Sequence, residues 1–245
     1  MIIELHTPSC WKDLTSDQLR EVVNQGLMNM PREEFLLALF CKFANVVMVA
    51  GKANGDPSPS TVPVKTRFKD KGGHEFELED WQVVDFCNRL DFAFDEQMPM
   101  EVAWPFKWDR YLMDTKFGDW FHADAQILGF ALEGNPERLL GAMKDLGDPH
   151  DSIEPCDITL MLRWYECFKD WLQERYPLVF QKPSPGSESQ VSPVENRQNI
   201  MLMLNDNRPQ DNEAIEQSNV HDVLAALQHK IEYAKQIEQQ MSKHS

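Results

Sequence analysis

The sequence predicts a mainly α-helical protein with one small β-hairpin and a helical arm at its C-terminus. Most of the chain spaces its apolar residues three and four apart, as one face of an α-helix does. Residues near 62–78 instead alternate apolar and polar side chains around Lys71-Gly72-Gly73, which is typical of a hairpin. A segment at 181–193, rich in Ser, Pro and Gly, has the composition of a flexible linker between helical regions.

The most apolar helical stretch, residues 117–132, is expected to be a central helix. Five of its residues fall at helical spacing on one face: Phe117, Trp120, Phe121, Leu128 and Ala131. Trp120, Ala123, Ile127 and Phe130 widen that face on one side. A face this wide suits a helix with neighbours on several sides.

Asp124 interrupts the apolar face of this helix. A buried carboxylate must be paired or protonated. We therefore expect Asp124 to be mostly buried and to specify the core through an ion pair or a bond to a helix end. Candidate partners are Arg110, Arg138 and Arg163. The alternative is a catalytic acid.

Before the central helix, local signals place two short helices and several strands. Thr15 and Gln18 have the spacing of a capping box before a helix whose apolar face runs from Leu19 to Leu27. A second helix follows Met30-Pro31, and 46–50 reads as a strand. Residues 2–5 are a possible edge strand, and 51–63 have the composition of a loop.

An aromatic connector follows a helix predicted over 79–95, whose core face is Val83, Phe86, Leu90 and Phe94. Residues 98–109 carry two prolines and the aromatic side chains Trp104, Phe106 and Trp108. These aromatics are expected either to pack in the core or to form a partner-binding groove. Beyond the central helix, Asn135-Pro136 begins a short helix, and Asp157 caps a long one over 158–176.

These features divide the chain into a helical core at 1–180, a linker at 181–193 and a C-terminal arm at 194–245. A last helix is predicted from about 211 to 243. Its apolar seam has the spacing of a heptad repeat at Val220, Leu224, Leu227, Ile231 and Ala234; Glu238 breaks it and Met241 resumes it. Such a seam predicts a helix that docks on a partner, or on its own core until a partner displaces it. Truncation at Gln190 would then leave the core folded.

Composition limits the classes of partner. Lys and Arg number 24 against 40 Asp and Glu, a formal net charge of -16. Such a surface repels phosphate backbones, so no nucleic-acid partner is expected, whereas a basic protein would be attracted. No apolar run is long enough for a membrane span. Five cysteines without a CxxC pair fit a reducing cytoplasm.

The sequence offers no catalytic, cofactor-binding or metal motif. Gly-rich nucleotide loops, GxSxG and HExxH are absent. His150 and Asp151 lie in an acidic loop without the spacing of a zinc or calcium site. Glu166 and Asp170 lie one helical turn apart among basic residues, which indicates a solvated, salt-bridged face. No cofactor is expected.

A family resemblance rests on several motifs spread over most of the chain. They are Leu5-His6-Thr7-Pro8, Phe40-Cys41-Lys42-Phe43, Phe117-Gly118-Asp119-Trp120, Trp164-Tyr165-Glu166-Cys167, Arg175-Tyr176-Pro177, Leu202-Met203-Leu204 and Val223-Leu224-Ala225-Ala226-Leu227. In these the chain resembles a family encoded in the tail-gene regions of phages and prophages of Bacteroides-type bacteria. Phe117-Gly118-Asp119-Trp120 departs from the family's more usual Phe-Gly-Glu-Phe, and the loop at 51–63 is peculiar to this chain.

The resemblance implies a tail assembly chaperone, by analogy of gene position and helical character. Such a protein would act without catalysis in the host cytoplasm, holding tape-measure or other tail proteins before they polymerise. The expected contact residues are Val220, Leu224, Leu227 and Ile231 of the arm, with Trp104, Phe106 and Trp108 of the connector. A virion adaptor or connector subunit is the second hypothesis, and an enzyme with a site around Asp124 is the third.

Overall fold

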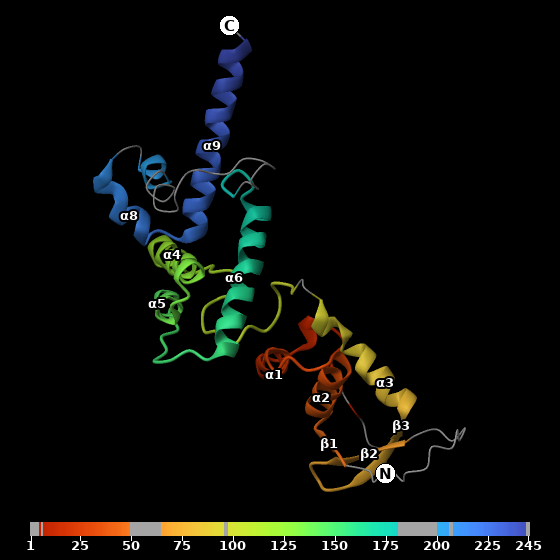
Figure 1. Ribbon diagram of the computed structural model, residues 1–245. Coiled ribbons are helices and arrows are strands. Elements are labelled where there is room, and N and C mark those ends of the chain that lie inside the picture. The colour runs from red at the N-terminus through yellow and green to blue at the C-terminus, as the bar shows by residue number, and fades with distance from the viewer. Residues whose placement is uncertain are drawn as a thin grey trace. The chain divides into compact units, whose positions relative to one another are not determined.

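The computed structural model describes residues 5, 7–49, 65–95, 98–180, 200–205 and 208–243. The predicted loop at 51–63 and linker at 181–193 lie outside these ranges, as do residues 2–4 of the edge strand expected at 2–5; Leu5, its last residue, is in no strand. The chain forms two compact units, an N-terminal unit Met1–Pro105 and a C-terminal unit Phe106–Ser245. Helices dominate both units beside one three-stranded antiparallel sheet, which confirms the predicted fold class (Figure 1).

The N-terminal unit combines three α-helices with the sheet among its described residues. Its elements are η1 (Trp11–Asp13), α1 (Ser16–Leu27), α2 (Arg32–Ala44), β1 (Val46–Met48), β2 (Lys65–Asp70), β3 (Glu75–Glu79), α3 (Asp80–Arg89) and η2 (Asp91–Phe94). Thr15 and Gln18 form both bonds of the predicted capping box. β2 pairs with β1 on one side and β3 on the other, so the predicted hairpin is confirmed.

Aromatic side chains join the sheet to its helices. Phe40 of α2 is fully buried, with its ring 5.5 Å from that of Phe68 on β2 and 5.1 Å from that of Phe86 on α3. The core face predicted for the helix over 79–95 is confirmed at Leu90, which is fully buried. It is wrong at Phe94, which is 42% exposed. The helix ends at Arg89 and gives way to η2, which rotates Phe94 away from the face that a continuous helix would present.

The C-terminal unit is entirely helical among its regular elements in the described ranges. They are α4 (Phe117–Glu133), α5 (Pro136–Asp145), α6 (Pro155–Arg175), a short helix at 200–204, η3 (Pro209–Asp211), α8 (Asn212–Gln217) and α9 (Val220–Lys243). No helix in the described part of the chain has the length and apolarity that crossing a membrane requires.

Trp164 of α6 lies at the centre of an aromatic core in this unit. Its side chain is 1% exposed, and its ring is 5.3 Å from that of Phe168 and 5.2 Å from that of Trp108. The indole N–H donates to the carbonyl oxygen of Arg110 at 3.1 Å. Phe106 stacks on Trp108 at 4.3 Å, so these two connector aromatics pack against α6.

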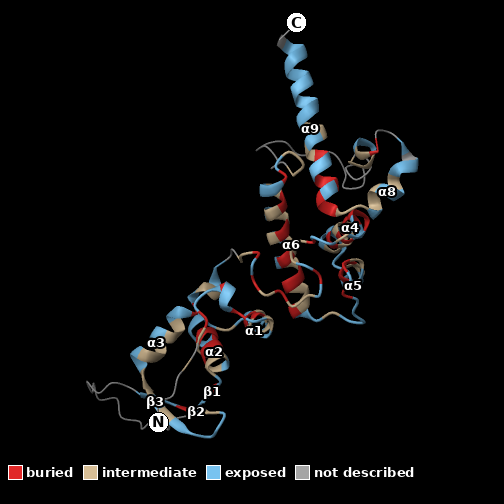
Figure 2. Ribbon diagram, turned by 180° about the vertical axis from the view of Figure 1, so that it is seen from behind, coloured by how far each residue is buried: buried red, intermediate tan, exposed pale blue. Residues whose placement is uncertain are grey.

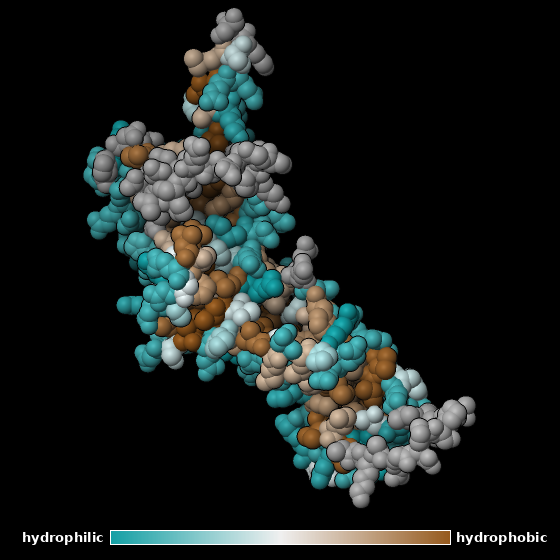
Figure 3. All heavy atoms as spheres, in the orientation of Figure 1, coloured by the Kyte–Doolittle hydropathy of each residue, from teal (hydrophilic) through white to brown (hydrophobic). Residues whose placement is uncertain are grey.

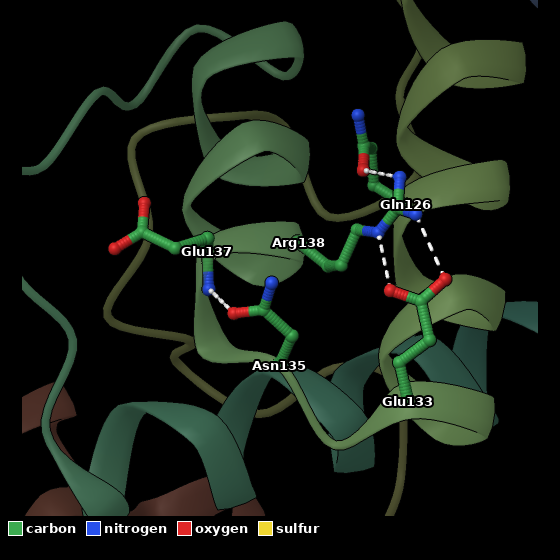
Figure 4. A network of polar contacts seen from close by, with 5 residues as sticks. All are labelled: Gln126, Glu133, Asn135, Glu137 and Arg138. Atoms are coloured by element: carbon green, nitrogen blue, oxygen red, sulfur yellow. Dashed lines mark hydrogen bonds and ion pairs between the residues drawn. The ribbon is translucent and has the colours of Figure 1, made fainter.

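A polar cluster closes the turn between α4 and α5 (Figure 4). The Asn135 side chain accepts from the amide of Glu137 at 3.1 Å, as the predicted N-cap should. Arg138 reaches back to α4, where its guanidinium donates to Glu133 at 2.8 and 3.1 Å and to Gln126 at 3.2 Å. These contacts fix α5 alongside the C-terminal half of α4.

The predicted single helix over 211–243 is interrupted. α8 ends at Gln217, and α9 begins at Val220, because the two residues between them pair with the segment before α4. The amide of Phe117 donates to the carbonyl of Ser218 at 2.8 Å. The amide of Val220 donates to the carbonyl of Thr115 at 3.0 Å. Asn219 accepts from the amide of His221 at 2.8 Å, a local cap for the new helix.

The predicted separation of a core at 1–180 from an arm at 194–245 differs from the observed division. α8 and the first part of α9 belong to the C-terminal unit. Val220, Leu224 and Leu227 are at most 2% exposed, so the seam packs on its own chain, which is one of the two arrangements expected for it. The physical reason is that burying this seam beside α4 removes more apolar surface from water than an isolated helix can. Figure 2 shows buried residues along the first part of α9 and exposed ones along the rest.

Candidate functional site: an apolar pocket beside α4

The C-terminal unit contains a pocket of about 410 Å³ beside α4. α4 contributes Phe117, Trp120, Phe121, Asp124, Ala125, Leu128, Gly129 and Leu132. The remaining lining residues come from the end of α6, the segment after it, residue 200 and α9: Lys169, Val179, Phe180, Ile200, Leu224 and Leu227. Its size and its mainly apolar lining, with few polar groups, are typical of a binding site.

The C-terminal half of α4 leaves large apolar side chains at the surface. Leu128 is 37% exposed and Leu132 is 81% exposed, although Leu128 was predicted to belong to the core face. Ala131, also assigned to that face, is exposed. Ala123 and Ile127 are the buried residues instead, at 1% and 2% exposure. The helix therefore packs through a face rotated from the predicted one, and its other apolar residues line an open pocket.

Asp124 is the acidic group of the pocket, and its side chain is 14% exposed. Its Oδ1 atom accepts a hydrogen bond from the Tyr165 hydroxyl at 2.6 Å and another from the Lys169 ammonium at 3.2 Å. Burial raises the pKa of Tyr165 well above its ordinary value, and the nearby Asp124 carboxylate raises it further. Tyr165 therefore remains a neutral hydrogen-bond donor at physiological pH.

The expectation of a largely buried, paired Asp124 is confirmed, but its predicted partners are wrong. Arg138 binds Glu133, Arg163 binds Glu166 at 3.3 Å, and the Arg110 guanidinium lies 6.0 Å from the Tyr111 ring centroid. Lys169 takes the place of an arginine because it follows Tyr165 by four residues on α6. That spacing puts both side chains on one face of the helix, towards α4.

One polar atom of the pocket wall has bonding capacity left. Among the described residues, the Oδ2 atom of Asp124 accepts no hydrogen bond, since both bonds go to Oδ1. An occupant of the pocket that supplies a hydrogen-bond donor could bind this oxygen.

Lys169 also lies against the aromatic wall of the pocket. Its ammonium is 5.5 Å from the ring centroid of Tyr165 and 5.1 Å from that of Phe180. These contacts hold the cation beside Asp124, so the polar pair has a fixed place in an otherwise apolar surface.

The other residues predicted to bind a partner are dispersed. Val220, Leu224 and Leu227 are buried, and Ile231 is half-buried at the point where α9 leaves the unit. Trp104 belongs to the N-terminal unit, where its indole donates to the carbonyl of Met100 at 3.1 Å. Phe106 and Trp108 pack in the aromatic core of the other unit. The three aromatic residues of the connector are therefore divided between the two units.

The acidic loop after α5 is organised around a buried carboxylate. Asp148 is 2% exposed and lies 3.0 Å from the Lys107 ammonium and 3.2 Å from the His150 ring. Although burial favours the neutral acid, the bonds from Lys107 and His150 lower the pKa of Asp148. No group of three or more His, Cys, Asp or Glu within the described ranges is placed to hold a metal ion.

No protein-family model, curated protein or solved structure matches this chain.

Sequence reasoning identified Asp124 but missed most of its surroundings. Lys169 was assigned to a solvated face because its neighbours Glu166 and Asp170 are charged. Tyr165 and Lys169 are four residues apart, and this spacing was the available signal for their shared contact. A hydroxyl and an ammonium one helical turn apart can both reach one carboxylate.

Proposed function

We propose that this chain is a non-enzymatic phage or prophage tail assembly protein. It holds an apolar segment of a tail protein, such as the tape-measure protein, in the pocket beside α4 before assembly. It works in the cytoplasm of the host cell through protein–protein contacts, with no cofactor. The resemblance of its motifs to proteins of tail-gene regions supports this role.

The open pocket is the observation that carries the proposal. Leu128 and Leu132 present apolar surface at its edge, and an exposed apolar patch of this kind is typical of a protein-interaction site. A client side chain entering the pocket would remove both its own surface and that of the lining from water. Figure 3 shows that hydrophobic residues reach the surface of this unit at several places.

The state of Asp124 favours binding over catalysis. An enzyme with a site here would need a titratable group free to exchange a proton with substrate. Asp124 and Lys169 are instead paired with each other, and Tyr165 is a neutral donor to the same carboxylate. This arrangement orients a polar pair for recognition and keeps both charges compensated.

Binding measurements with the tail proteins encoded beside this chain test the proposal. Leu132→Glu places a charge at the pocket edge without disturbing the core and should weaken binding at least roughly tenfold. Leu27→Glu is the matched control, because Leu27 is also exposed, at 50%, but lies on α1 of the other unit. Equal binding by the two variants and the parent chain would contradict the proposal.

Analysis of purified particles separates a chaperone from a structural subunit. An assembly chaperone leaves before the particle is complete, so the chain should be missing from purified virions by mass spectrometry. A constant ratio of this chain to the major tail proteins in virions would instead support the adaptor or connector function.

A further inference from the structure

The pocket beside α4 combines an aromatic wall with a single ion pair. Asp124 and Lys169 are the only charged side chains among the described residues that line it. The aromatic rings of the lining belong to Phe117, Trp120, Phe121 and Phe180. The chemistry of an occupant must therefore suit both a ring-lined apolar surface and this pair.

The ion pair leaves one acceptor atom open to the pocket. Oδ1 of Asp124 accepts from the Tyr165 hydroxyl at 2.6 Å and from the Lys169 ammonium at 3.2 Å, and these are the bonds of its carboxylate among the described residues. Oδ2 is not one of the side-chain oxygens there that are both fully buried and without a partner, so part of its surface is accessible. The side chain as a whole is only 14% exposed. A donor inside the pocket can thus meet Oδ2 where little water competes for it.

The charges of the pair select against an ionic occupant. Lys169 already compensates the charge of Asp124, so a cation would be repelled by the ammonium and an anion by the carboxylate. Lys169 is 34% exposed, and water can accept from its remaining N–H groups, so the occupant does not have to supply an acceptor. The pocket therefore favours a neutral group that donates one hydrogen bond.

An indole ring meets these conditions better than any other protein side chain. It is neutral, large and apolar, and it carries one N–H donor and no acceptor. Its faces and edges suit the aromatic wall, and a cavity of about 410 Å³ is large enough for a bicyclic ring. A phenol also donates, but its oxygen brings lone pairs into the apolar part of the pocket. An aliphatic side chain would leave Oδ2 without a donor.

We propose that the pocket recognises a tryptophan side chain of the client, whose indole N–H donates to Oδ2 of Asp124. The ring lies against the aromatic wall, and the apolar residues beside it in the client lie on Leu128 and Leu132 at the pocket edge. The inference rests on the proposed function for the nature of the occupant, a segment of a client protein, and adds the residue type that this segment presents. Tryptophan is a side chain that often dominates the binding energy of an interface.

Two small molecules measure the hydrogen bond directly. Skatole has the N–H donor of the tryptophan side chain, and N-methylskatole carries a methyl group in its place. Ligand-observed NMR titrations of the full chain should show that skatole binds at least about tenfold more tightly, because the methylated compound loses a hydrogen bond to a charged acceptor. Phenethylamine and para-cresol should both bind more weakly than skatole. Equal affinities for the two indoles, or tighter binding of the amine or the phenol, would overturn the proposal.

Asp124→Asn tests whether Oδ2 is the acceptor. The variant keeps Oδ1 for the Tyr165 hydroxyl but replaces Oδ2 with an amide group that donates. The preference for skatole over N-methylskatole should then disappear. The size of the methyl group is the same in both titrations, so it does not affect this comparison of variant and parent. Circular dichroism checks the fold of the variant, and the titration of the parent chain remains decisive if the variant is unfolded. A folded variant with an unchanged preference would contradict the proposal.

A pair of alanine substitutions on α4 locates the binding site. Ala125 is half-buried and lines the pocket, so Ala125→Leu fills part of the space and should weaken skatole binding at least about tenfold. Ala131→Leu is the matched control, because Ala131 is exposed and does not line the pocket. This variant should bind skatole as the parent does. The same affinity in both variants would place the site elsewhere and overturn the proposal.

Competition with the tail proteins separates this inference from the proposed function. N-acetyltryptophan amide has no terminal charges, so it should displace the tail proteins and bind more tightly than free tryptophan; tighter binding of the free amino acid would indicate a metabolite site and overturn the proposal. If Leu132→Glu weakens tail-protein binding but the parent chain binds neither indole, the inference fails and the proposed function stands. If skatole binds with the expected preference but no tail protein binds, the proposed function fails, and the assignment of the indole to a client fails with it.

Discussion

Asp124 holds two donors of α6 against α4, so its removal should destabilise the C-terminal unit. Asp124→Ala leaves the buried Tyr165 hydroxyl without its acceptor and Lys169 without its counter-ion. We expect a loss of about 1–3 kcal/mol in the free energy of unfolding. Lys169 is 34% exposed and can turn towards water, which keeps the cost below that of a fully buried pair.

A double-mutant cycle checks this assignment by urea unfolding. Tyr165→Phe alone should cost about 1 kcal/mol, and the same change in an Asp124→Ala background should cost close to nothing. Additive losses would mean that the two side chains stabilise the protein independently, in disagreement with the 2.6 Å contact.

Asp148 should make stability depend on pH. Its pKa is lowered in the folded protein, so it contributes stability above the unfolded value of about 4 and loses it as the pH falls below that value. Asp148→Asn should therefore be less stable than the parent by about 1–3 kcal/mol at neutral pH. Chemical unfolding at a series of pH values should show this difference shrinking below about pH 4; a difference that stays constant would exclude ionisation as its source.

For single residues, the sequence could identify a buried polar side chain but not the partners that it contacts. Asp124 is conspicuous because it interrupts an apolar face, and that pattern needs only helical periodicity. Its partner depends on the rotation of α6 against α4, which no local signal specifies. Asp148 shows the same limit, since Lys107 is 41 residues away and belongs to a different segment.

Gly118 determines how closely α8 approaches α4. A Cβ atom at this position would lie 3.0 Å from the Glu216 Cβ and 3.2 Å from the Glu216 carbonyl oxygen. Because one of these atoms is backbone, Gly118→Ala should force α8 to move and weaken the pairing of Ser218 with Phe117. We expect a loss of about 1–3 kcal/mol in the free energy of unfolding.

Gly26 is the control for this substitution. It also lies in a helix, α1, but a Cβ atom there would meet only the Phe35 ring, at 4.0 Å. Gly26→Ala should stabilise the protein by up to about 1 kcal/mol, because alanine favours the helix. If both substitutions shifted the melting temperature in the same direction, the close contact with Glu216 would not be the cause of the change at Gly118.

Helix starts were predictable where their signals are local. Thr15 with Gln18, and Asn135 with Pro136, carry the chemistry of an N-cap within four residues. The break before α9 is different. Ser218-Asn219 can cap a helix, but the surrounding apolar periodicity continues, and pairing with residues 115–117 decides the outcome. That pairing joins segments about a hundred residues apart, beyond the reach of a local pattern.

The division of the whole chain was the least predictable feature. The predicted boundary followed composition, since 181–193 is rich in Ser, Pro and Gly. The observed boundary, between Pro105 and Phe106, lies in an aromatic stretch that has no linker composition. Trp104 packs in one unit and Trp108 in the other, so the aromatic residues there complete two separate cores. Only the long-range contacts of each unit distinguish this arrangement from a single core.

Truncation tests whether α8 and α9 are part of the C-terminal unit. A chain ending at Gln190 loses Val220, Leu224 and Leu227, each of which contributes about 1.5–3 kcal/mol by burial. It also loses the bonds from buried His221 to the Tyr111 carbonyl at 2.7 Å and the Tyr176 hydroxyl at 3.1 Å. These losses amount to much of the roughly 5–15 kcal/mol that stabilises an ordinary domain. The melting temperature of the C-terminal unit should therefore fall sharply, or its transition should disappear.

A shorter deletion is the matched control. Removing 233–245 takes away only the exposed part of α9 and leaves every buried residue of the seam in place. Because every buried residue of the seam is kept, this chain should melt within a few degrees of the parent. If the chain ending at Gln190 also kept its melting temperature, α4 and α6 would form a stable core without α9. The buried seam would then be a reversible contact that a partner could displace.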